Sequence, residues 1–432
     1  MLRRKFLDRL LQWREHKDKE CLLVKGARQI GKTYIIDYFG RHNYASYIYI
    51  NFIETPKLAE IFTGDLSAQE IYKRISLLMP KSKFIEHDTL LFLDEIQLCP
   101  EARTALKFLA LDNRYDVIAS GSLLGISYKE VSSIPVGYET QVTMYALDFE
   151  EYLWALGYTE ENISALKKYF LRKESVPLVV HEKMLKLLRE YMVVGGMPAV
   201  VNKFVETNHF GLVQQEQDKI LASYQEDVAK YASNTEKPKV RNCYLSIPKQ
   251  LAKENKKFQF SVVEKKGTSR KFENSIEWLR DANLVYLCYN VSTPTFPLAA
   301  YEKEDMYKLY LADIGLLIAM YGYDMKQAII DDTLAGAAKG GIYENLIADM
   351  LVKNGHKLNY FRSQNGDTEI EFLLSQQAKI IPVEVKANRG STLSLNRLLE
   401  QKQIPYGYKL ISGNIGTNDK KIVLPLYMAM FL

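Results

Sequence analysis

The sequence predicts an α/β protein whose first domain is built on a parallel sheet, and three observations predict it. An apolar run over residues 21–24 precedes a glycine-containing loop and a helical pattern over residues 33–39. Two later apolar runs, residues 90–93 and 116–119, have the length and composition of buried strands. Polar side chains follow each run, at the carboxyl ends of strands where open α/β sheets bind their ligands.

The loop after the first run has the spacing of a phosphate-binding P-loop. GARQIGKT, residues 26–33, fits the pattern G-x-x-x-x-G-K-[ST]. Its glycines let backbone N–H groups face an anionic phosphate, Lys32 would reach the β- and γ-phosphates, and the Thr33 hydroxyl would bind Mg²⁺. A glycine-containing turn that matches by chance is the alternative. The predicted nucleotide-binding residues are Gly26, Ala27, Arg28, Gln29, Ile30, Gly31, Lys32, Thr33 and Tyr34.

The second and third runs supply candidate catalytic groups. Leu90–Leu93 ends in Asp94 and Glu95, the form of a Walker B element. We expect Asp94 to hold Mg²⁺ and Glu95 to polarise the attacking water, although an acidic pair can also be a solvated loop start. The third run leads into a Ser-Gly-Ser turn, in which Ser120 or Ser122 would sense the γ-phosphate or simply form a turn.

Composition is that of a globular protein with several domains. The chain has 432 residues, of which 47% are hydrophobic and 25% charged, so two to four domains are expected. No stretch approaches the roughly 18 apolar residues of a membrane span. The amphipathic pattern between Leu2 and Trp13 predicts a helix packed on the core, with a membrane-surface role as the lesser alternative. Four widely spaced cysteines suit a reducing, cytoplasmic setting.

Six segments in this order resemble one family, the AAA+-like P-loop ATPases of bacteria and archaea that carry a C-terminal domain of unknown function. They are GARQIGKT, LLFLDEIQ, ASGSLLG, YALDFEEYLWALG, VGGMPAVV and YLADIGLL. The resemblance spans most of the chain and implies ATP as the nucleotide and ATP hydrolysis as the activity. Relatives commonly show Gly-Arg where this chain has Gly137-Tyr138. Charge at the γ-phosphate would then be stabilised by Arg114 or Arg103, or hydrolysis would be slow.

The remaining chain divides by its pattern. We predict an ATPase core over residues 1–158 and a helical lid over 159–229, interrupted by a turn at Gly195-Gly196-Met197-Pro198. A basic winged-helix-like domain is predicted over 230–310 and a restriction-endonuclease-like α/β domain over 311–432. The segment from Lys230 to Lys271 contains ten Lys and two Arg against three Glu, an excess of nine positive charges in a chain whose net charge is +5.

This basic segment makes DNA or RNA a candidate partner. A helix over residues 270–282 would be a recognition helix, with Lys265, Lys266, Arg270 and Lys271 near its start to contact phosphates. A solvated lysine face or a winged helix used for protein contact explains the same pattern equally well.

The last segment shows an E…E-x-K pattern that resembles the restriction-endonuclease superfamily. We predict a helix over 342–353 with Glu344, strands over 358–362, 369–374 and 380–386, a helix over 395–402 and a last strand over 408–412. Strand alternation puts Glu369 and Glu371 on one face, and Glu384 and Lys386 on one face. Glu371 and Glu384 would hold a divalent ion while Lys386 activates water, with Glu344 as an outer partner. A decayed nuclease-like binding domain and an ordinary charged sheet are the alternatives.

Two functional hypotheses follow. In the first, ATP hydrolysis regulates action on nucleic acid by the C-terminal half, which would cleave it in a metal-dependent way. In the second, the protein is a nucleotide-gated interaction switch that binds a protein partner and has an inactive nuclease-like domain. Assembly into an oligomer is compatible with both.

Overall fold

Contacts divide the chain into two compact units. The computed structural model describes residues 2–16, 19–121, 137–233, 235–386 and 392–432. The first, here called the sheet unit, contains residues 4–145 and 281–283. The other, the C-terminal unit, is formed mainly by residues 146–280 and 284–432.

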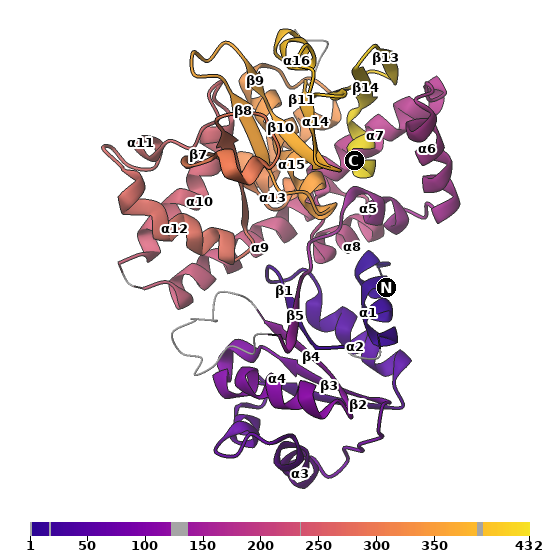
Figure 1. The fold of residues 1–432 in the computed structure, drawn as a ribbon, viewed down its shortest axis with the longest axis vertical. Helices are drawn as coiled ribbons and strands as arrows, with labels where there is room; N and C mark the ends of the chain where they lie inside the picture. Colours follow the sequence, from indigo (N-terminus) through magenta and orange to yellow (C-terminus); the bar gives the residue numbers. More distant parts are fainter. Residues whose placement is uncertain (1, 17–18, 122–136, 234, 387–391) are drawn as a thin grey trace. The chain divides into compact units, whose positions relative to one another are not determined.

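A five-stranded parallel sheet forms the centre of the sheet unit, in the order β2-β3-β4-β1-β5 (Figure 1). Its strands are β1 (Cys21–Lys25), β2 (Ser46–Asn51), β3 (Thr89–Asp94), β4 (Asp116–Gly121) and β5 (Glu139–Thr143). The three strands predicted from apolar runs are confirmed as β1, β3 and β4. Because β4 lies between β1 and β3 and all pair in parallel, the P-loop and the acidic pair leave the sheet at the same edge.

Helices cover both faces of this sheet. They are α1 (Lys5–Glu15), α2 (Lys32–Asn43), α3 (Ala68–Leu78) and α4 (Pro100–Asp112), with short 3-10 helices η1 (Pro56–Phe62) and η2 (Ile96–Leu98). Ile71 of α3 and Leu106 of α4 share one apolar cluster with Leu23 and Leu91 of the sheet. Alternate strand side chains point to the other face, where α2 contacts β2 and β3.

The amphipathic N-terminal helix packs as predicted. Phe6, Leu10 and Trp13 of α1 are buried, and α1 contacts α2. Arg4, directly before α1, is also buried, and its guanidinium donates to the carbonyl oxygens of Ile30 and Tyr145 at 3.0 and 2.6 Å. The segment before β1 therefore supports the end of the P-loop from outside the sheet.

The C-terminal unit begins with α5 (Phe149–Ala155), which precedes the predicted helical lid. The lid prediction over 159–229 corresponds to α6 (Glu160–Arg172), α7 (Leu178–Val194), α8 (Pro198–Thr207) and α9 (Phe210–Tyr231). Asp148 and Glu151 form a capping box that starts α5. The predicted turn is confirmed: α7 ends before Gly195, and Pro198 is the first residue of α8.

Three of the segments that carry the family resemblance, those containing Leu147, Gly196 and Asp313, contact one another in the C-terminal unit. The N–H of Gly196 donates to Asp313 Oδ2 at 2.7 Å, and the carbonyl oxygen of Gly196 accepts from the N–H of Leu147 at 2.7 Å. A Cβ on Gly196 would collide with Leu147. Asp313 also accepts from Leu316 N at 2.9 Å and so caps the next helix. Close backbone packing therefore accounts for these three motifs, and no catalytic or binding role is needed to explain them.

The region predicted to be winged-helix-like, residues 230–310, folds mainly as three helices and a hairpin, and the hairpin belongs to a larger sheet. The elements are α10 (Lys237–Leu251), α11 (Phe260–Val263), α12 (Ser269–Asp281), β6 (Val285–Val291), η4 (Leu298–Tyr301), β7 (Glu302–Leu311), α13 (Ile314–Tyr321), α14 (Tyr323–Ile330), α15 (Gly336–Lys353), β8 (Asn359–Arg362) and β9 (Glu369–Ile370). The sheet order is β7-β6-β8-β9. Residues on both sides of the boundary predicted at 310–311 therefore share one sheet.

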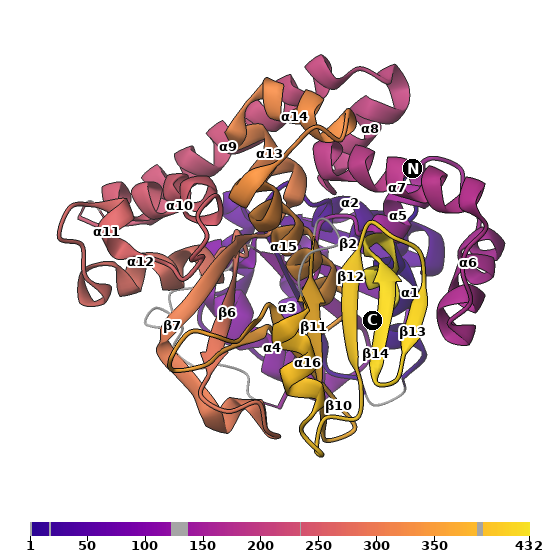
Figure 2. The ribbon, with the colours of Figure 1, turned by 90° about the horizontal axis from the view of Figure 1, so that it is seen from above.

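A second sheet of five strands ends the chain (Figure 2). The elements are β10 (Phe372–Gln376), β11 (Lys379–Val385), α16 (Leu393–Leu399), β12 (Gly407–Ile411), β13 (Gly416–Asn418), β14 (Lys421–Pro425) and η5 (Leu426–Phe431), in the sheet order β10-β11-β12-β14-β13. Two predictions need correction. The strand predicted over 369–374 breaks at Glu371, with β9 and β10 in different sheets. The strand over 408–412 is not the last, because Ile422 and Leu424 of β14 supply further buried side chains.

Candidate functional site

The P-loop connects β1 to α2 through a backbone that needs its glycines. Gly31 directly precedes α2 with φ 90°, a left-handed conformation. Gly26 has φ 152°, and a Cβ there would collide with the carbonyl oxygen of Met144 and the side chain of Ile30. The loop is thus closed tightly over the end of β1, and the amino end of α2 faces the space beyond it.

Lys32 is held by the loop itself. Its Nζ donates to the carbonyl oxygens of Gly26 and Ala27 at 3.0 and 2.7 Å. Burial lowers the pKa of Lys32 to about 8, against the opposing effect of the nearby carboxylates of Glu95 and Asp94. The ammonium group is therefore only partly stabilised within the protein, which favours a phosphate group as its partner. Thr33 and Tyr34, the next two residues of the motif, are exposed.

Asp94 is the centre of a hydrogen-bond network that joins three strands, β2, β3 and β4, to α2. Its Oδ2 accepts from Thr33 Oγ1 at 2.9 Å, from Tyr49 OH at 3.2 Å and from Asn51 Nδ2 at 3.2 Å. Its Oδ1 accepts from Ser120 Oγ. Asn51 and Ser120 are the register partners of Asp94 on β2 and β4. The P-loop hydroxyl and the acidic strand end are therefore in direct contact.

Glu95 leaves β3 in a left-handed conformation, with φ 56°. Its carboxylate accepts a hydrogen bond from Gln97 Nε2, which belongs to η2. Gln97 is 7% exposed, and its Oε1 is buried without a hydrogen-bond partner in the part of the chain that the structure describes. Gln97 is thus a positioning partner of the proposed base.

Of the two serines predicted to sense the γ-phosphate, the structure describes only Ser120. Ser120 is fully buried and donates to Asp94, so its hydroxyl orients the Asp94 carboxylate. Ser122 lies outside the described residues. The other predicted P-loop residues include Ile30, which is buried, and Arg28 and Gln29, which are partly or fully exposed.

The arginines proposed to replace the missing Gly-Arg lie at the wrong edge of the sheet. Arg103 pairs with Glu139 at 2.9 Å, and Glu139 is the register partner of Cys21, the first residue of β1. The P-loop follows the last residue of β1, about 13 Å away at 3.3 Å per residue. Arg114 precedes β4 and pairs with Asp112 at 3.0 Å. Both guanidinium groups are paired with carboxylates near the amino ends of core strands, which does not favour either arginine as the cation at the γ-phosphate.

Sequence reasoning missed three polar residues beside the acidic pair, Tyr49, Asn51 and Gln97. Each touches Asp94 or Glu95 through the hydrogen bonds described above. A signal for two of them was present in the sequence. SYIYIN, residues 46–51, has the composition of a β-strand and ends in a polar residue, as the other core strands do. Assigning β2 would have placed Asn51 at the same sheet edge as Asp94.

A second charged cluster lies in the C-terminal unit, around residues 371–386. Lys386 Nζ is 2.8 Å from Glu371 Oε1 and 3.9 Å from Glu384 Oε1. Glu371 Oε2 accepts from the N–H of Val385 at 3.2 Å. Burial and the neighbouring Glu371 together raise the pKa of Glu384 to about 7, against the opposing effect of nearby lysines. The structure therefore brings together the three side chains of the predicted E…E-x-K pattern.

Glu344 and Glu369 meet a different lysine. Lys308 of β7 is 1% exposed, and its Nζ lies 2.7 Å from Glu369 Oε1 and 3.3 Å from Glu344 Oε2. Glu344 also pairs with Lys256 at 3.0 Å and accepts from Tyr310 OH at 3.1 Å. These pairs connect the hairpin to α15 and β9. They lower the pKa of Glu344 against the opposing effect of its burial.

The nuclease-like cluster fits a divalent ion only in part. Glu384 Oε2 is buried and lacks a hydrogen-bond partner among the described residues, and a free carboxylate oxygen is a suitable metal ligand. Both oxygens of Glu371 are occupied, so a metal ion shared by the two acids would displace Lys386. Over the described ranges, no group of three His, Cys, Asp or Glu side chains is arranged to hold a metal ion.

The predicted nucleic-acid contacts lie around the turn before α12. Lys265, Lys266, Arg270 and Lys271 are all exposed. Lys271 pairs with Glu264 at 2.6 Å, so part of this charge is balanced locally. The exposure of Lys265, Lys266 and Arg270 leaves the predicted nucleic-acid contact a prediction, because the described residues show no geometry that selects a partner.

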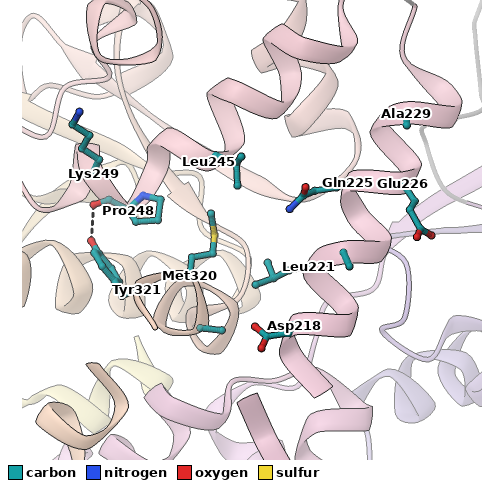
Figure 3. Close-up of a pocket in the computed structure, with 12 residues that line it drawn as sticks. Asp218, Leu221, Gln225, Glu226, Ala229, Leu245, Pro248, Lys249, Met320 and Tyr321 are labelled. Carbon is teal, nitrogen blue, oxygen red and sulfur yellow. Dashed lines mark hydrogen bonds between the residues drawn. The ribbon is translucent and has the colours of Figure 1, made fainter. Parts of the chain in front are cut away.

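A separate hollow lies between three helices of the C-terminal unit. Its volume is about 820 Å³, and its lining comes from α9, α10 and α13. Leu221 and Gln225 extend from α9 toward Met320 and Leu245, while Tyr321 OH donates to the carbonyl oxygen of Pro248 at 2.6 Å (Figure 3). Its charged lining residues are Asp218, Glu226 and Lys249, so its net charge is small.

Membrane insertion of a helix finds no support in the described part of the chain, because no helix there is both long and apolar enough to span a bilayer. The four cysteines are buried free thiols, and burial raises their pKa values above the ordinary range for a thiol.

Family models match most of the chain in three consecutive parts. Residues 18–153 match an AAA domain, residues 185–327 a domain of unknown function (DUF8612), and residues 339–428 another domain of unknown function (DUF4143). The site geometry and the first match together define the class: the chain carries an N-terminal AAA-type P-loop ATPase domain. The two further domains follow it in the C-terminal unit.

Among solved structures, the chain is similar to a Walker-type ATPase of Pyrococcus abyssi at 12% identity, covering 74% of this chain and 96% of that one with a TM-score of 0.42. It is also similar to the ORC1 protein of Aeropyrum pernix in complex with DNA (14% identity, 76% and 93% covered, TM-score 0.31). A third is DnaA of Aquifex aeolicus bound to AMPPCP (16%, 64% and 86%, TM-score 0.27). No curated protein sequence matches the chain.

Proposed function

We propose that the protein binds ATP and hydrolyses it with Mg²⁺, and that this cycle regulates nucleic-acid binding or processing by the C-terminal unit. The observation that carries the ATPase part is the 2.9 Å hydrogen bond between Thr33 Oγ1 and Asp94 Oδ2. It joins the P-loop hydroxyl to the acidic end of β3 beside Lys32, whose Nζ donates to two backbone carbonyl oxygens among the described residues. These are the groups that Mg²⁺ and a triphosphate need in one place.

Each residue then has a defined task. Lys32 and the backbone N–H groups of the P-loop bind the phosphates, while Thr33 and Asp94 hold the metal ion. When bound, Mg²⁺ would offset negative charge on the phosphate oxygens. Ser120, Tyr49 and Asn51 keep the Asp94 carboxylate in place by hydrogen bonds. Glu95, oriented by Gln97, accepts a proton from the attacking water.

The test is the steady-state rate of Mg²⁺-dependent ATP hydrolysis for the wild type and Glu95→Gln. Loss of a positioned base lowers such rates by about 10²- to 10⁴-fold, so we expect Glu95→Gln to bind ATP with nearly unchanged affinity and to hydrolyse it at least 100-fold more slowly. Glu101→Gln makes the same chemical change on the exposed surface of α4 and should keep the wild-type rate. Equal rates for all three proteins would contradict the role of Glu95.

The nucleic-acid part of the proposal rests on the exposed cations around the start of α12 and on the nuclease-like E…E-x-K arrangement. It predicts that single- or double-stranded DNA raises the ATPase rate, and that neutralising Lys265, Lys266 and Arg270 together removes this effect. A rate that DNA does not change in wild type would contradict it.

A second candidate function is a nucleotide-gated protein-interaction switch whose nuclease-like domain is inactive. The favouring observation is the 2.8 Å ion pair between Lys386 and Glu371, which neutralises a carboxylate that a nuclease would use to bind metal. This candidate predicts no cleavage of DNA or RNA with Mg²⁺ or Mn²⁺. Metal-dependent cleavage by wild type, lost in Lys386→Ala and kept in the exposed control Lys379→Ala, would contradict it.

A further inference from the structure

A groove on the C-terminal unit has an apolar floor and an acidic rim. Its volume is about 590 Å³, and α12 and the β6–β7 hairpin provide most of its lining. From α12 come Glu273, Ile276, Glu277 and Arg280, which follow the i, i+3, i+4, i+7 spacing of a single helix face. An entire face of the helix expected to read nucleic acid is therefore turned to this groove.

The floor is aromatic and aliphatic. Phe260, Ile276, Leu287, Tyr289 and Tyr307 contribute to it, and the rings of Tyr289 and Tyr307 lie 5.9 Å apart in an edge-to-face arrangement. Tyr307 is 8% exposed, and its hydroxyl forms no hydrogen bond with any described residue. This hydroxyl can therefore form a hydrogen bond with a polar group of a ligand in the groove.

The rim is strongly acidic within a basic protein. Five carboxylates line the groove, from Glu273, Glu277, Glu302, Glu304 and Asp305, against two cations, Arg280 and Lys357, which leaves an excess of three negative charges. Lys357 is taken by Glu302 at 2.8 Å. Glu273, Glu304 and Asp305 are exposed and have no ion-pair partner among the described residues. Because the chain as a whole carries +5, this local field has the opposite sign to the net charge.

We propose that this groove, here called the acidic groove, binds a basic segment of a partner protein with lysine or arginine at the rim and apolar side chains on the floor. The charge excludes a phosphate backbone from this face of α12, since phosphates would lie against unpaired carboxylates. It also selects the cationic peptide, because complementary charge steers the partner to the groove while the apolar floor gives it contact area. This inference rests on the interaction-switch candidate and is independent of ATP hydrolysis.

The experiment measures binding of a fluorescent synthetic peptide in which lysine alternates with leucine to the full chain, by anisotropy. The test variant is the triple change Glu273→Gln, Glu304→Gln and Asp305→Asn. The matched control is Glu161→Gln, Glu174→Gln and Glu206→Gln, three exposed acids of the helical region with the same total charge change. We expect the test variant to bind about tenfold more weakly, because each exposed pair contributes a few-fold, and the control to bind as wild type does.

A second peptide separates groove binding from general charge attraction. Replacing its leucines by serine keeps the charge and removes contact with the floor, so we expect weaker binding to wild type and a smaller difference between wild type and the test variant. Equal losses in test and control variants, or no binding by wild type, would overturn the proposal. Displacement of the peptide by a DNA oligonucleotide, or self-association that the test variant abolishes, would also overturn it. The ATPase rate of each variant, measured separately, shows whether the proposed ATPase function is intact.

Discussion

The nucleotide site and the nuclease-like cluster use lysine and carboxylate in opposite ways. At the nucleotide site, Lys32 is held by two backbone carbonyl oxygens, and Asp94 is held by neutral hydroxyl and amide groups. In the C-terminal unit, Lys386 pairs directly with Glu371, and Lys308 pairs with Glu344 and Glu369. At the nucleotide site the lysine and the carboxylate are therefore not paired with each other. Each can bind the oppositely charged part of a ligand such as a metal–triphosphate complex.

The contacts of these side chains distinguish a site prepared for a ligand from a set of charges that satisfy one another. Both regions have acidic residues and a lysine at spacings typical of enzymes, so the sequence predicts a catalytic site in each of them. Only the contacts show that charge at the P-loop is left for a ligand, whereas charge in the cluster is largely balanced inside the protein. Stability and binding should therefore respond in opposite directions when the two sites are changed.

The largest expected effect is on ATP binding in Lys32→Ala. Hydrogen bonds from charged groups contribute about 1.5–3 kcal/mol each, so losing contacts to two phosphates should weaken ATP at least 100-fold. Lys57→Ala, an exposed lysine of the same unit, is the control and should bind normally. Titration with a fluorescent ATP analogue measures both, and equal affinities would remove the distinction between the two sites.

Glu384→Gln should have the opposite kind of effect, an increase in stability. The pKa of Glu384 is raised to about 7 in the folded protein, so the folded state binds its proton more tightly than the unfolded state does. The contribution of this group to stability is therefore greatest at low pH and falls as pH rises from about 4.5 to about 7. The full difference is about 3 kcal/mol at 1.36 kcal/mol per pKa unit.

Urea unfolding at several pH values measures this effect, with the exposed Glu400→Gln as control. We expect Glu384→Gln to be more stable than wild type at pH 8, with a smaller difference at low pH. Lower stability of Glu384→Gln at pH 8 would mean that the charged carboxylate has a stabilising partner, and it would contradict the raised pKa of Glu384 on which this prediction rests.

The pH dependence of ATP binding should show Lys32 directly. Its pKa is lowered to about 8, and a bound phosphate favours the charged form, so binding requires proton uptake above that pH. Affinity should be constant below about pH 7 and fall about tenfold by about pH 9. Lys32→Arg removes a titration in this range because arginine stays charged. A wild-type affinity that does not change with pH would contradict this prediction.

The smallest effect is expected for Tyr49→Phe. The hydrogen bond to Asp94 is lost, as is the one that Tyr49 OH accepts from Asn51 Nδ2 at 2.9 Å, while those from Thr33, Asn51 and Ser120 to Asp94 remain. Stability should therefore fall by about 1–2 kcal/mol. The ATPase rate should change less than threefold, since the carboxylate keeps most of its support. A large loss of rate would show that Tyr49 has a role in the reaction beyond positioning Asp94.

Sequence predicted most of the sheet unit because strand, loop and helix there follow one another locally. The P-loop, three core strands and the amphipathic N-terminal helix all depend on short-range patterns. The contacts of Arg4 with the P-loop and of Asn51 with Asp94 depend on strand order, which no short pattern specifies. The sequence did not place Arg103 and Arg114 correctly, because their position relative to the strands of the sheet also depends on strand order.

The C-terminal unit was harder because its strands change sheets. Alternation over residues 369–374 indicates one strand, but the chain passes from one sheet to the other at Glu371, so alternation does not fix which side chains share a face. The sequence of the basic segment shows its net charge, but it does not show how the charged side chains are distributed over the folded surface. Pairing of Lys271 with Glu264 and the carboxylates facing the acidic groove appear only when α12 is placed against the hairpin.

The most direct test of the account is the Mg²⁺ dependence of ATP hydrolysis in wild type, Thr33→Val and Asp94→Asn. If Thr33 and Asp94 hold the metal ion together, both variants should need much more Mg²⁺ for half-maximal rate, and Asp94→Asn should be the more impaired because it loses a charge. Thr33→Ser should resemble wild type. Identical Mg²⁺ curves for all four proteins would contradict the assignment of this site.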